Sequence, residues 1–486
     1  MMVYREQRRR VATADILRRV GEARGFEREM EMGELHAGVA DAFCPDCDRD
    51  VRNAELPAEV EISVPEGFAY YAVDPELYRM AARRFLAEQR PESVAVIGIR
   101  SIGATLGGVV ESELRKHDVA TRFATVRPRS HPFDRQLRVD YDLAHSWLGW
   151  TGVFAIVDEG PGPSATSFAS VSEFLGTLGI RDDRIVLFPS RDADPAAFHS
   201  ERARRCWTRH RRYTVPFEDL HKFDDAADLS AGKWREGLRR WPAVQPQHER
   251  RKYLCADRLY KFAGYGRYGR EKLERAARLD GWIPTVLGLE DGFLVTRWVE
   301  GRPVRTTAEF VEHAARYLAH VARGFRTGQP ADTATLAHLI EVNTGRSWND
   351  PLPESEAVLL DGHMARHEWL ETASGIVKTD AVDHYDDQFF PGPQDIAWDV
   401  AAFGIECGAA RRVAERYAEL AGDRGIADRL PFYRAAYLAF RLGYCDTAAE
   451  ALGGSEDAAR FARARQRYEA LIGNERWTSK TNRLSA

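Results

Sequence analysis

The sequence predicts an α/β doubly wound parallel sheet followed by a two-lobed α+β domain. Between about residues 60 and 195, short apolar strands alternate with helices, which is the pattern of a parallel sheet joined by crossover helices. From about residue 245 the pattern changes to a few strands and then mostly helix. A chain of 486 residues has room for both domains, since a domain commonly contains about 100–200 residues.

Four segments are expected along the chain: a helical N-terminal arm over 1–55, the sheet domain over 56–200, a basic connector over 201–240 and the second domain over 241–480. The connector is rich in arginine and ends in WPAVQPQ, whose prolines mark the entrance of a new domain. In the sheet domain, the expected strands are 92–99, 120–128, 151–158 and 183–190, and the expected helices are 73–89, 104–117 and 167–179. These assignments rest on short apolar runs for strands and on one-sided apolar patterns for helices.

Balanced charge limits the partners that the chain is expected to have. Lys and Arg number 69 against 74 Asp and Glu, a net charge of −5, so no global basic field favours nucleic acid. Six cysteines indicate a reducing compartment, although Cys44 and Cys47 form half of a zinc-binding pattern. Neither a signal peptide nor an apolar run of membrane-spanning length is seen. We expect a cytoplasmic protein with small-molecule substrates. The sequence is compatible with a monomer or an oligomer.

Asp158 and Glu159 end a buried strand in the segment GVFAIVDEGPGPSATSF. A loop of small residues follows, and a helix then begins. Backbone N–H groups at the start of a helix, together with hydroxyls, can cradle a phosphate. Adjacent carboxylates can accept hydrogen bonds from vicinal ribose hydroxyls. The expected phosphate contacts are Gly162, Ser164, Thr166 and Ser167.

This segment resembles the PRPP-binding motif of type I phosphoribosyltransferases, in which a strand, paired acids and a phosphate loop occur in that order. The resemblance covers about residues 70–195 and implies PRPP and Mg²⁺ as cofactors, with Asp158 and Glu159 in the catalytic site. It implies that RSIGATLGG binds pyrophosphate and that TVRPRSHPFDR is a mobile hood loop. The pyrophosphate contacts that it implies are Arg100, Ser101, Gly103, Arg127 and Arg129. Pro163 departs from the pattern, because it removes a donor.

The second domain begins with a strand lysine and a helix that carries acids. Lys261 lies between apolar neighbours in RLYKFAG, and Glu271 and Glu274 share one face of the following helix. This order resembles the aminoglycoside phosphotransferase and choline kinase type of protein-kinase-like fold. The resemblance implies that Lys261 grips ATP phosphates and that one of the two glutamates holds it. No glycine-rich loop precedes Lys261, which departs from that pattern.

Further along the chain, VLLDGHMARHEWL precedes GIVKTDAVDHYDDQFFPGPQDIAWDVA. In the resembled family a catalytic-loop His-Gly-Asp is followed by Asn, but here Asp361 stands at the His position, His363 at the Asp position and Glu368 at the Asn position. We prefer Asp361 as the base, with His363 as the alternative. The resemblance implies that Asp380 and Glu368 hold Mg²⁺ and that Asp395 anchors the loop.

The leading hypothesis is therefore a bifunctional small-molecule enzyme. A phosphoribosyltransferase site would use PRPP, and an ATP-dependent phosphotransferase site would act on a hydroxyl of a small metabolite, which can be a ribosylated product. In a second hypothesis, the first domain senses a nucleotide or PRPP without catalysis and gates the kinase. In a third, both sites have decayed and the chain is a scaffold.

Overall fold

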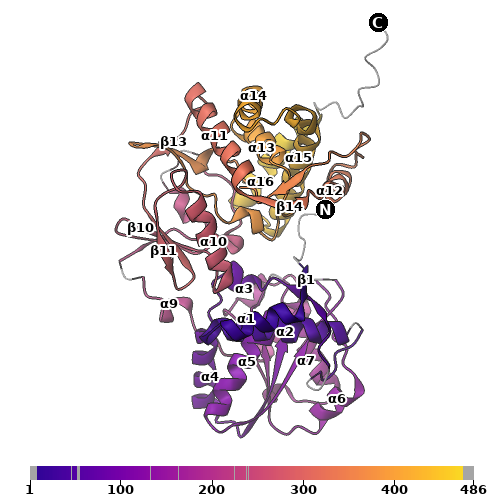
Figure 1. The fold of residues 1–486 in the computed structure, drawn as a ribbon. Helices are drawn as coiled ribbons and strands as arrows, with labels where there is room; N and C mark the ends of the chain where they lie inside the picture. The colour runs from indigo at the N-terminus through magenta and orange to yellow at the C-terminus, as the bar shows by residue number, and fades with distance from the viewer. Residues whose placement is uncertain are drawn as a thin grey trace. The chain divides into compact units, whose positions relative to one another are not determined.

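The computed structural model describes residues 8–44, 46–51, 55–131, 133–162, 164–223, 225–236, 238 and 240–473. The chain forms two compact units (Figure 1). Among the described residues, the sheet unit lies within 8–223 and 265–267, and the C-terminal unit lies within 225–264 and 268–473. Each unit is described by itself below.

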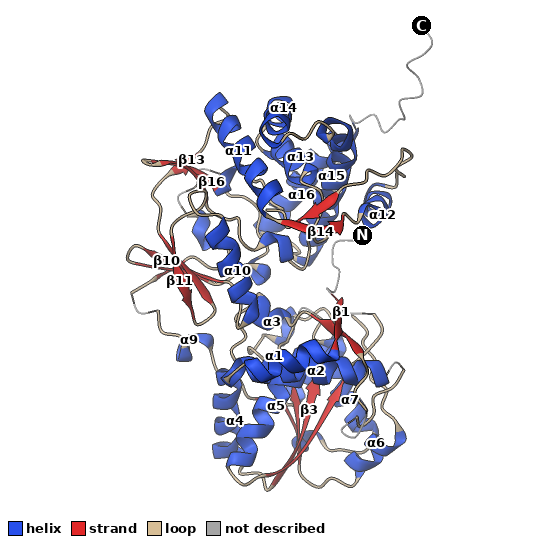
Figure 2. Ribbon diagram, in the orientation of Figure 1, coloured by secondary structure: helices blue, strands red, loops and turns tan. Residues whose placement is uncertain are grey.

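A five-stranded parallel sheet forms the centre of the sheet unit, in the order β4-β3-β5-β6-β7 (Figure 2). The strands are β3 Ser93–Ile99, β4 Ala120–Val126, β5 Val153–Val157, β6 Ile185–Phe188 and β7 Arg211–Arg212. The predicted parallel sheet is confirmed. Strands β3, β5 and β6 are almost entirely buried, as expected for parallel strands that helices cover on both faces.

The helices around this sheet are α4 Pro75–Gln89, α5 Ile102–Lys116, α6 Tyr141–Leu148, α7 Thr166–Thr177, α8 Glu201–Arg209 and α9 Phe217–Leu220. Helix α5 packs against β3 and β4, whereas Phe168 of α7 and Trp207 of α8 share a buried apolar cluster with Ile97 of β3. Strand β3 has β4 on one side and β5 on the other. The carboxyl ends of β3 and β5 therefore form the switch point at which such sheets bind ligands.

The residues before the parallel sheet form β1 Arg8–Ala12, α1 Thr13–Glu22, α2 Gly25–Phe43, β2 Glu59–Ser63 and α3 Glu66–Ala69. The segment expected to be a helical arm thus also contains a strand, β1, which pairs with β2 in antiparallel fashion. Helix α2 packs closely on α5, because a Cβ atom on Gly33 would lie only 1.9 Å from Oγ1 of Thr105. Glycine permits this close approach of the two helices.

An antiparallel sheet in the order β11-β12-β10-β9-β8 begins the C-terminal unit. Its strands are β8 Ala227–Asp228, β9 Lys252–Cys255, β10 Arg258–Phe262, β11 Val286–Glu290 and β12 Phe293–Arg297, and helix α10 Arg267–Arg278 connects β10 to β11. Phe262 of β10 is fully buried in the apolar side of the sheet. Its neighbour Lys261 projects from the other face, because side chains alternate along a strand.

The rest of the C-terminal unit is mainly helical: α11 Ala308–Gly324, α12 Thr333–Thr344, α13 Ala397–Glu406, α14 Ala410–Ala421, α15 Ile426–Ala451 and α16 Glu456–Gly473. Helix α15 packs against α12, α13 and α16 in the centre of this part (Figure 1). Two small sheets join β13 Arg302–Pro303 with β16 Trp369–Thr372 and β17 Gly375–Lys378, and β14 Arg326–Pro330 with β15 Glu356–Val358. Within the described ranges, no helix is long and apolar enough to cross a membrane.

Candidate functional site

The expected catalytic loop, residues 359–368, is anchored by Asp399 of α13. Asp399 is fully buried, and its two carboxylate oxygens accept hydrogen bonds from the backbone N–H groups of Asp361 (2.9 Å) and Gly362 (3.0 Å). Burial, together with the nearby charge of Asp361, raises the pKa of Asp399 to about 7. The loop is therefore tied to the helical core by side chain to backbone contacts.

Asp395, which we expected to anchor this loop, does not do so, and that expectation is wrong. Its carboxylate accepts a hydrogen bond from the backbone N–H of Ala397 (2.6 Å) and pairs with Arg429 (2.7 Å). Asp395 thus satisfies an N–H group at the start of its own helix. The two acids of QDIAWDVA are four residues apart, so their spacing alone does not distinguish Asp395 from Asp399.

Lys261 reaches acids that follow the hairpin β16–β17. Its Nζ atom lies 2.5 Å from Oδ1 of Asp380 and 3.0 Å from Oδ1 of Asp383. Burial opposes ionisation, but Lys261 and His384 hold the pKa of Asp380 well below its usual range. Asp383 also pairs with Arg250 (2.7 Å). The site is therefore a pair of carboxylates enclosed by basic side chains.

Glu271 and Glu274, the expected partners of Lys261, lie exposed on α10. The structure brings Lys261 to Asp380 and Asp383 instead. Sequence reasoning missed Asp383, because the run AVDHYDD also has the composition of a solvated surface segment.

Lys378 of β17 lies beneath the catalytic loop and was also missed. Its side chain is fully buried, and its Nζ atom donates to Oε2 of Glu368 (2.7 Å), to Oδ1 of Asp361 (3.3 Å) and to the carbonyl of Asp380. The hydroxyl of Tyr317 donates to the other oxygen of Asp361 at 2.6 Å. Asp361, the preferred base, is fully buried within these contacts. The signal in the sequence was a single lysine inside the apolar strand GIVK.

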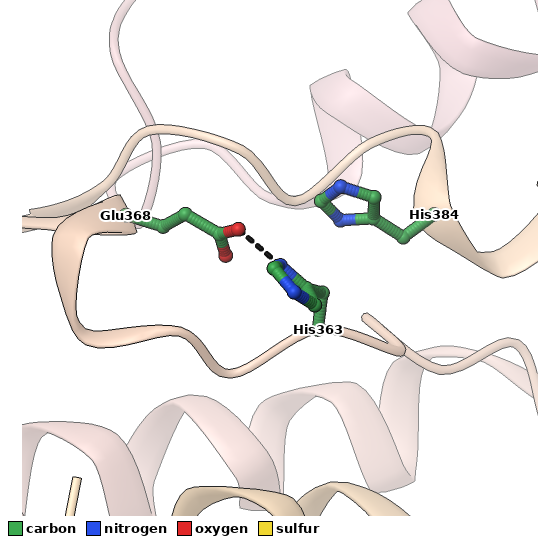
Figure 3. A group of neighbouring side chains, drawn as sticks. All are labelled: His363, Glu368 and His384. Atoms are coloured by element: carbon green, nitrogen blue, oxygen red, sulfur yellow. Dashed lines mark hydrogen bonds and ion pairs between the residues drawn. The ribbon is translucent and has the colours of Figure 1, made fainter. Parts of the chain in front are cut away.

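His363, Glu368 and His384 converge beside this lysine (Figure 3). Nδ1 of His363 forms an ion pair with Oε1 of Glu368, and the His363 side chain is 25% exposed. His384 stands in the 3₁₀ turn His384–Asp386, with Nδ1 3.9 Å from Oδ1 of Asp361 and Nε2 3.8 Å from Oδ2 of Asp380. Burial opposes protonation, but Asp380 and Asp361 raise the pKa of His384 to about 9.

In the sheet unit, Asp158 and Glu159 follow β5 at the switch point. Both are half-buried; Oε2 of Glu159 accepts a hydrogen bond from the backbone N–H of Gly67 (2.7 Å), and Tyr78 donates to the backbone carbonyl of Asp158 (2.7 Å). Burial raises the pKa of Asp158 to about 7 and the pKa of Glu159 well above its ordinary value. A bound cation, or hydroxyl groups that donate hydrogen bonds, would stabilise the ionised form of these two acids.

The expected phosphate loop leads from these acids into α7. Thr166, the first residue of α7, is fully buried, whereas Ser164 and Ser167 are half-buried and Gly162 is exposed. Pro163, where we expected a missing donor, lies outside the described residues. The described part of the loop therefore places hydroxyl-bearing residues at the start of α7 and just before it.

The expected pyrophosphate contacts lie against two carboxylates, Asp41 near the end of α2 and Asp48 in the segment after it. The guanidinium of Arg100 is fully buried and pairs with Asp41 (2.9 Å) and Asp48. Arg127 pairs with Asp41 (2.6 Å) and donates to the hydroxyl of Ser101 (2.7 Å). Arg129 lies 3.5 Å from Asp48. The three arginines are thus neutralised within the sheet unit, and sequence reasoning missed the two aspartates because they belong to the expected arm.

Gly103, expected beside the pyrophosphate, stands in the first turn of α5. A Cβ atom there would lie 2.7 Å from the carbonyl oxygen of Val157 and 3.2 Å from the carbonyl carbon of Gly98. This glycine therefore lets α5 approach β3 and β5 closely. Its described contacts are packing contacts with the sheet.

The raised pKa of Asp158 predicts a pH-dependent stability. Asp158 of the folded chain stays protonated up to about pH 7, whereas the ordinary pKa of an aspartate is 3.8. The stabilisation that follows from the raised pKa is complete below pH 3.8 and is lost as the pH rises through 7. We expect Asp158→Asn, which stays neutral, to melt at a higher temperature than the wild type at pH 8. The corresponding difference in the free energy of unfolding should shrink by about 1.4 kcal/mol for each pH unit below 7.

Thermal unfolding followed by fluorescence from pH 5 to pH 8 checks this expectation. Asp142→Asn is the matched control, because Asp142 is exposed in the first turn of α6. A difference between Asp158→Asn and the wild type that stays constant over this pH range would contradict the buried-acid assignment.

No protein-family model and no curated protein matches the chain. About half of the chain is similar to solved structures of small-molecule kinases. A choline/ethanolamine kinase family protein from Mesorhizobium loti shares 16% identity over 46% of this chain and 85% of that chain, with a TM-score of 0.33. The GDP complex of aminoglycoside 2'-phosphotransferase-IIIa shares 11% identity over 48% of this chain and 92% of that chain, with a TM-score of 0.32. Choline kinase LicA from Streptococcus pneumoniae shares 12% identity over 46% of this chain and 90% of that chain, with a TM-score of 0.31.

Proposed function

We propose that the C-terminal unit is an ATP-dependent phosphotransferase that acts on a hydroxyl group of a small metabolite. The observation that carries this proposal is the contact between Lys261 and Asp380, beside a loop that Asp399 ties to the core. A strand lysine and a carboxylate after a hairpin are the parts that phosphoryl transfer uses to hold phosphates and a divalent cation.

The proposed roles follow from the surroundings of each side chain. Lys261 would bind ATP phosphates when it leaves Asp380, and the oxygens of Asp380 and Glu368 fit the preference of Mg²⁺ for hard ligands. Mg²⁺, when bound, would neutralise charge on the phosphates. The proton acceptor is Asp361 or His363; His363 is the more exposed of the two, since Asp361 is completely enclosed.

A second activity is proposed for the sheet unit, where PRPP or a related ribose phosphate would bind at the switch point. Its support is the pair Asp158 and Glu159 directly before a helix that begins at Thr166. The carboxylates would bind the ribose hydroxyls, and the start of α7 would bind the 5′-phosphate. If this site turns PRPP over, the chain is bifunctional. If it binds PRPP without turnover, the sheet unit is a sensor that gates the phosphotransferase.

The test is an incubation of the full chain with a metabolite extract, ATP and PRPP, read by mass spectrometry for new phosphorylated or ribosylated species. We expect a phosphorylated product that requires ATP and disappears in the Asp380→Asn variant. Asp291→Asn, in an exposed turn, is the matched control. A product that is unchanged in Asp380→Asn would overturn the assignment of the transfer site, and PRPP binding without pyrophosphate release would favour the sensor.

A further inference from the structure

We propose that His363, Glu368 and His384 form a binding site for a first-row transition-metal dication, represented by Zn²⁺. One ligand atom from each residue lies within 4.8 Å of the others, and Figure 3 shows the three side chains pointing toward one another. The inference rests on the proposed function and deepens it, because it assigns Glu368, given above as a ligand of Mg²⁺, to a site that selects a transition metal instead. It is tested by metal binding alone, without ATP.

The chemistry of the donors sets the metal class. Two imidazole nitrogens and one carboxylate oxygen are the ligands of catalytic zinc sites and of other open transition-metal sites. Mg²⁺ prefers an all-oxygen environment and keeps most of its waters. His363 and Glu368 lie on the segment between β15 and β16, and His384 adds a nitrogen from the 3₁₀ turn after β17.

A hydrogen bond orients Glu368, and a carboxylate lies near His384. Lys378 donates to Oε2 of Glu368 at 2.7 Å, which leaves Oε1 on the side of His363. Nε2 of His384 faces Oδ2 of Asp380 at 3.8 Å. Nδ1 of His384 is buried and has no hydrogen-bond partner within the described part of the chain. A carboxylate behind a ligating histidine, and a donor behind a ligating carboxylate, are the usual supports of a metal site.

The distances require a small closure of the loop. Ligand atoms around a common ion lie about 3–4 Å apart, since metal–nitrogen and metal–oxygen bonds are about 2.0–2.2 Å long. The ion pair between His363 and Glu368 would therefore open, and His384 would move inward. The positive charge of Lys378 repels a dication. This ammonium also donates hydrogen bonds to Asp361 and to the carbonyl of Asp380, so Glu368 is not the one group that balances its charge.

The experiment uses the full chain with Cys44→Ser, so that the Cys44 and Cys47 pair does not bind zinc. The protein is stripped with a chelator and titrated with Zn²⁺ against a chromogenic competitor, and with Mg²⁺ in parallel. We expect one tightly bound Zn²⁺, held at least about 100-fold more tightly than Mg²⁺. His363→Ala, His384→Ala and Glu368→Gln should each weaken Zn²⁺ binding at least about 100-fold, whereas His338→Ala, on the exposed face of α12, should not.

Two further readouts keep the proposal falsifiable if one variant folds poorly. Zn²⁺ should raise the melting temperature of the parent protein and of His338→Ala but not of the ligand variants. The Co²⁺-loaded parent should show d–d absorption without a thiolate charge-transfer band. Equal affinity for Zn²⁺ and Mg²⁺, unchanged Zn²⁺ affinity in the ligand variants, or a Co²⁺ spectrum with thiolate ligands would overturn the metal site. Intact Zn²⁺ binding without ATP turnover would instead count against the proposed phosphotransferase.

Discussion

Replacing Lys261 with methionine is expected to lower ATP-dependent phosphoryl transfer about 100- to 1000-fold, the size expected when one preorganised donor to a developing charge is removed. Methionine keeps the length and the apolar stem of lysine, so the change removes the ammonium from β10 with little loss of packing. The ammonium otherwise contacts Asp380 at 2.5 Å and Asp383 at 3.0 Å. The initial rate of product formation, with the metabolite identified by mass spectrometry, measures the effect.

The same variant leaves the partly exposed carboxylate of Asp380 and the buried carboxylate of Asp383 without their shared cation, so its stability has to be measured separately. Thermal unfolding at pH 7 distinguishes a folded, inactive variant from an unfolded one. Lys233→Met is the matched control, because Lys233 is an exposed lysine that pairs with Asp228 on the same unit. If Lys261→Met is folded and transfers phosphate at the rate of Lys233→Met, Lys261 does not bind the phosphates of ATP.

Replacing Asp399 with alanine is expected to lower the free energy of unfolding by about 2–6 kcal/mol and to abolish transfer. The backbone N–H groups of Asp361 and Gly362 would be left buried without an acceptor, and each such group costs about 1–3 kcal/mol. The catalytic loop would then lose its attachment to α13. Urea or thermal unfolding, combined with the transfer rate, measures both effects.

Asp395→Ala is the informative comparison for Asp399→Ala. It removes the contact with the N–H of Ala397 and the pair with Arg429, so it should lower stability by about 0.5–2 kcal/mol while the folded protein keeps its transfer rate. A loss of transfer in folded Asp395→Ala, with transfer retained in Asp399→Ala, would restore Asp395 as the residue that anchors the loop.

Local pattern was sufficient to predict the main elements. The apolar runs at 92–99 and 151–158 become the buried strands β3 and β5, because a strand covered on both faces requires continuous apolar residues. The polar positions at the ends of strands could also be located: Asp158 follows β5, and Asp380 follows β17. Lys261 was identified because a single lysine stands out between the apolar neighbours of a strand, although the same pattern around Lys378 was missed.

The partners of these residues were decided by the tertiary structure. Sequence spacing describes neighbours along one helix or strand, but Lys261 and Asp380 are 119 residues apart, and Arg100 and Asp48 are 52 apart. Arg100 therefore was expected to face pyrophosphate, whereas folding encloses it with Asp41 of α2 and with Asp48, which follows α2. The choice between Asp395 and Asp399 had the same origin, because only the packing of α13 shows which acid meets the loop.

The sequence by itself determined the alternation of strands and helices between residues 92 and 190, the two kinds of unit and the chemical types of residue at each candidate site. These properties depend on local periodicity and on side-chain chemistry, which the chain carries whether or not it is folded. The tertiary structure alone decided which charges neutralise one another, that Asp361 is enclosed, and that His384 joins His363 and Glu368. Those outcomes depend on distances between segments remote in sequence, which are fixed when packing brings their elements together.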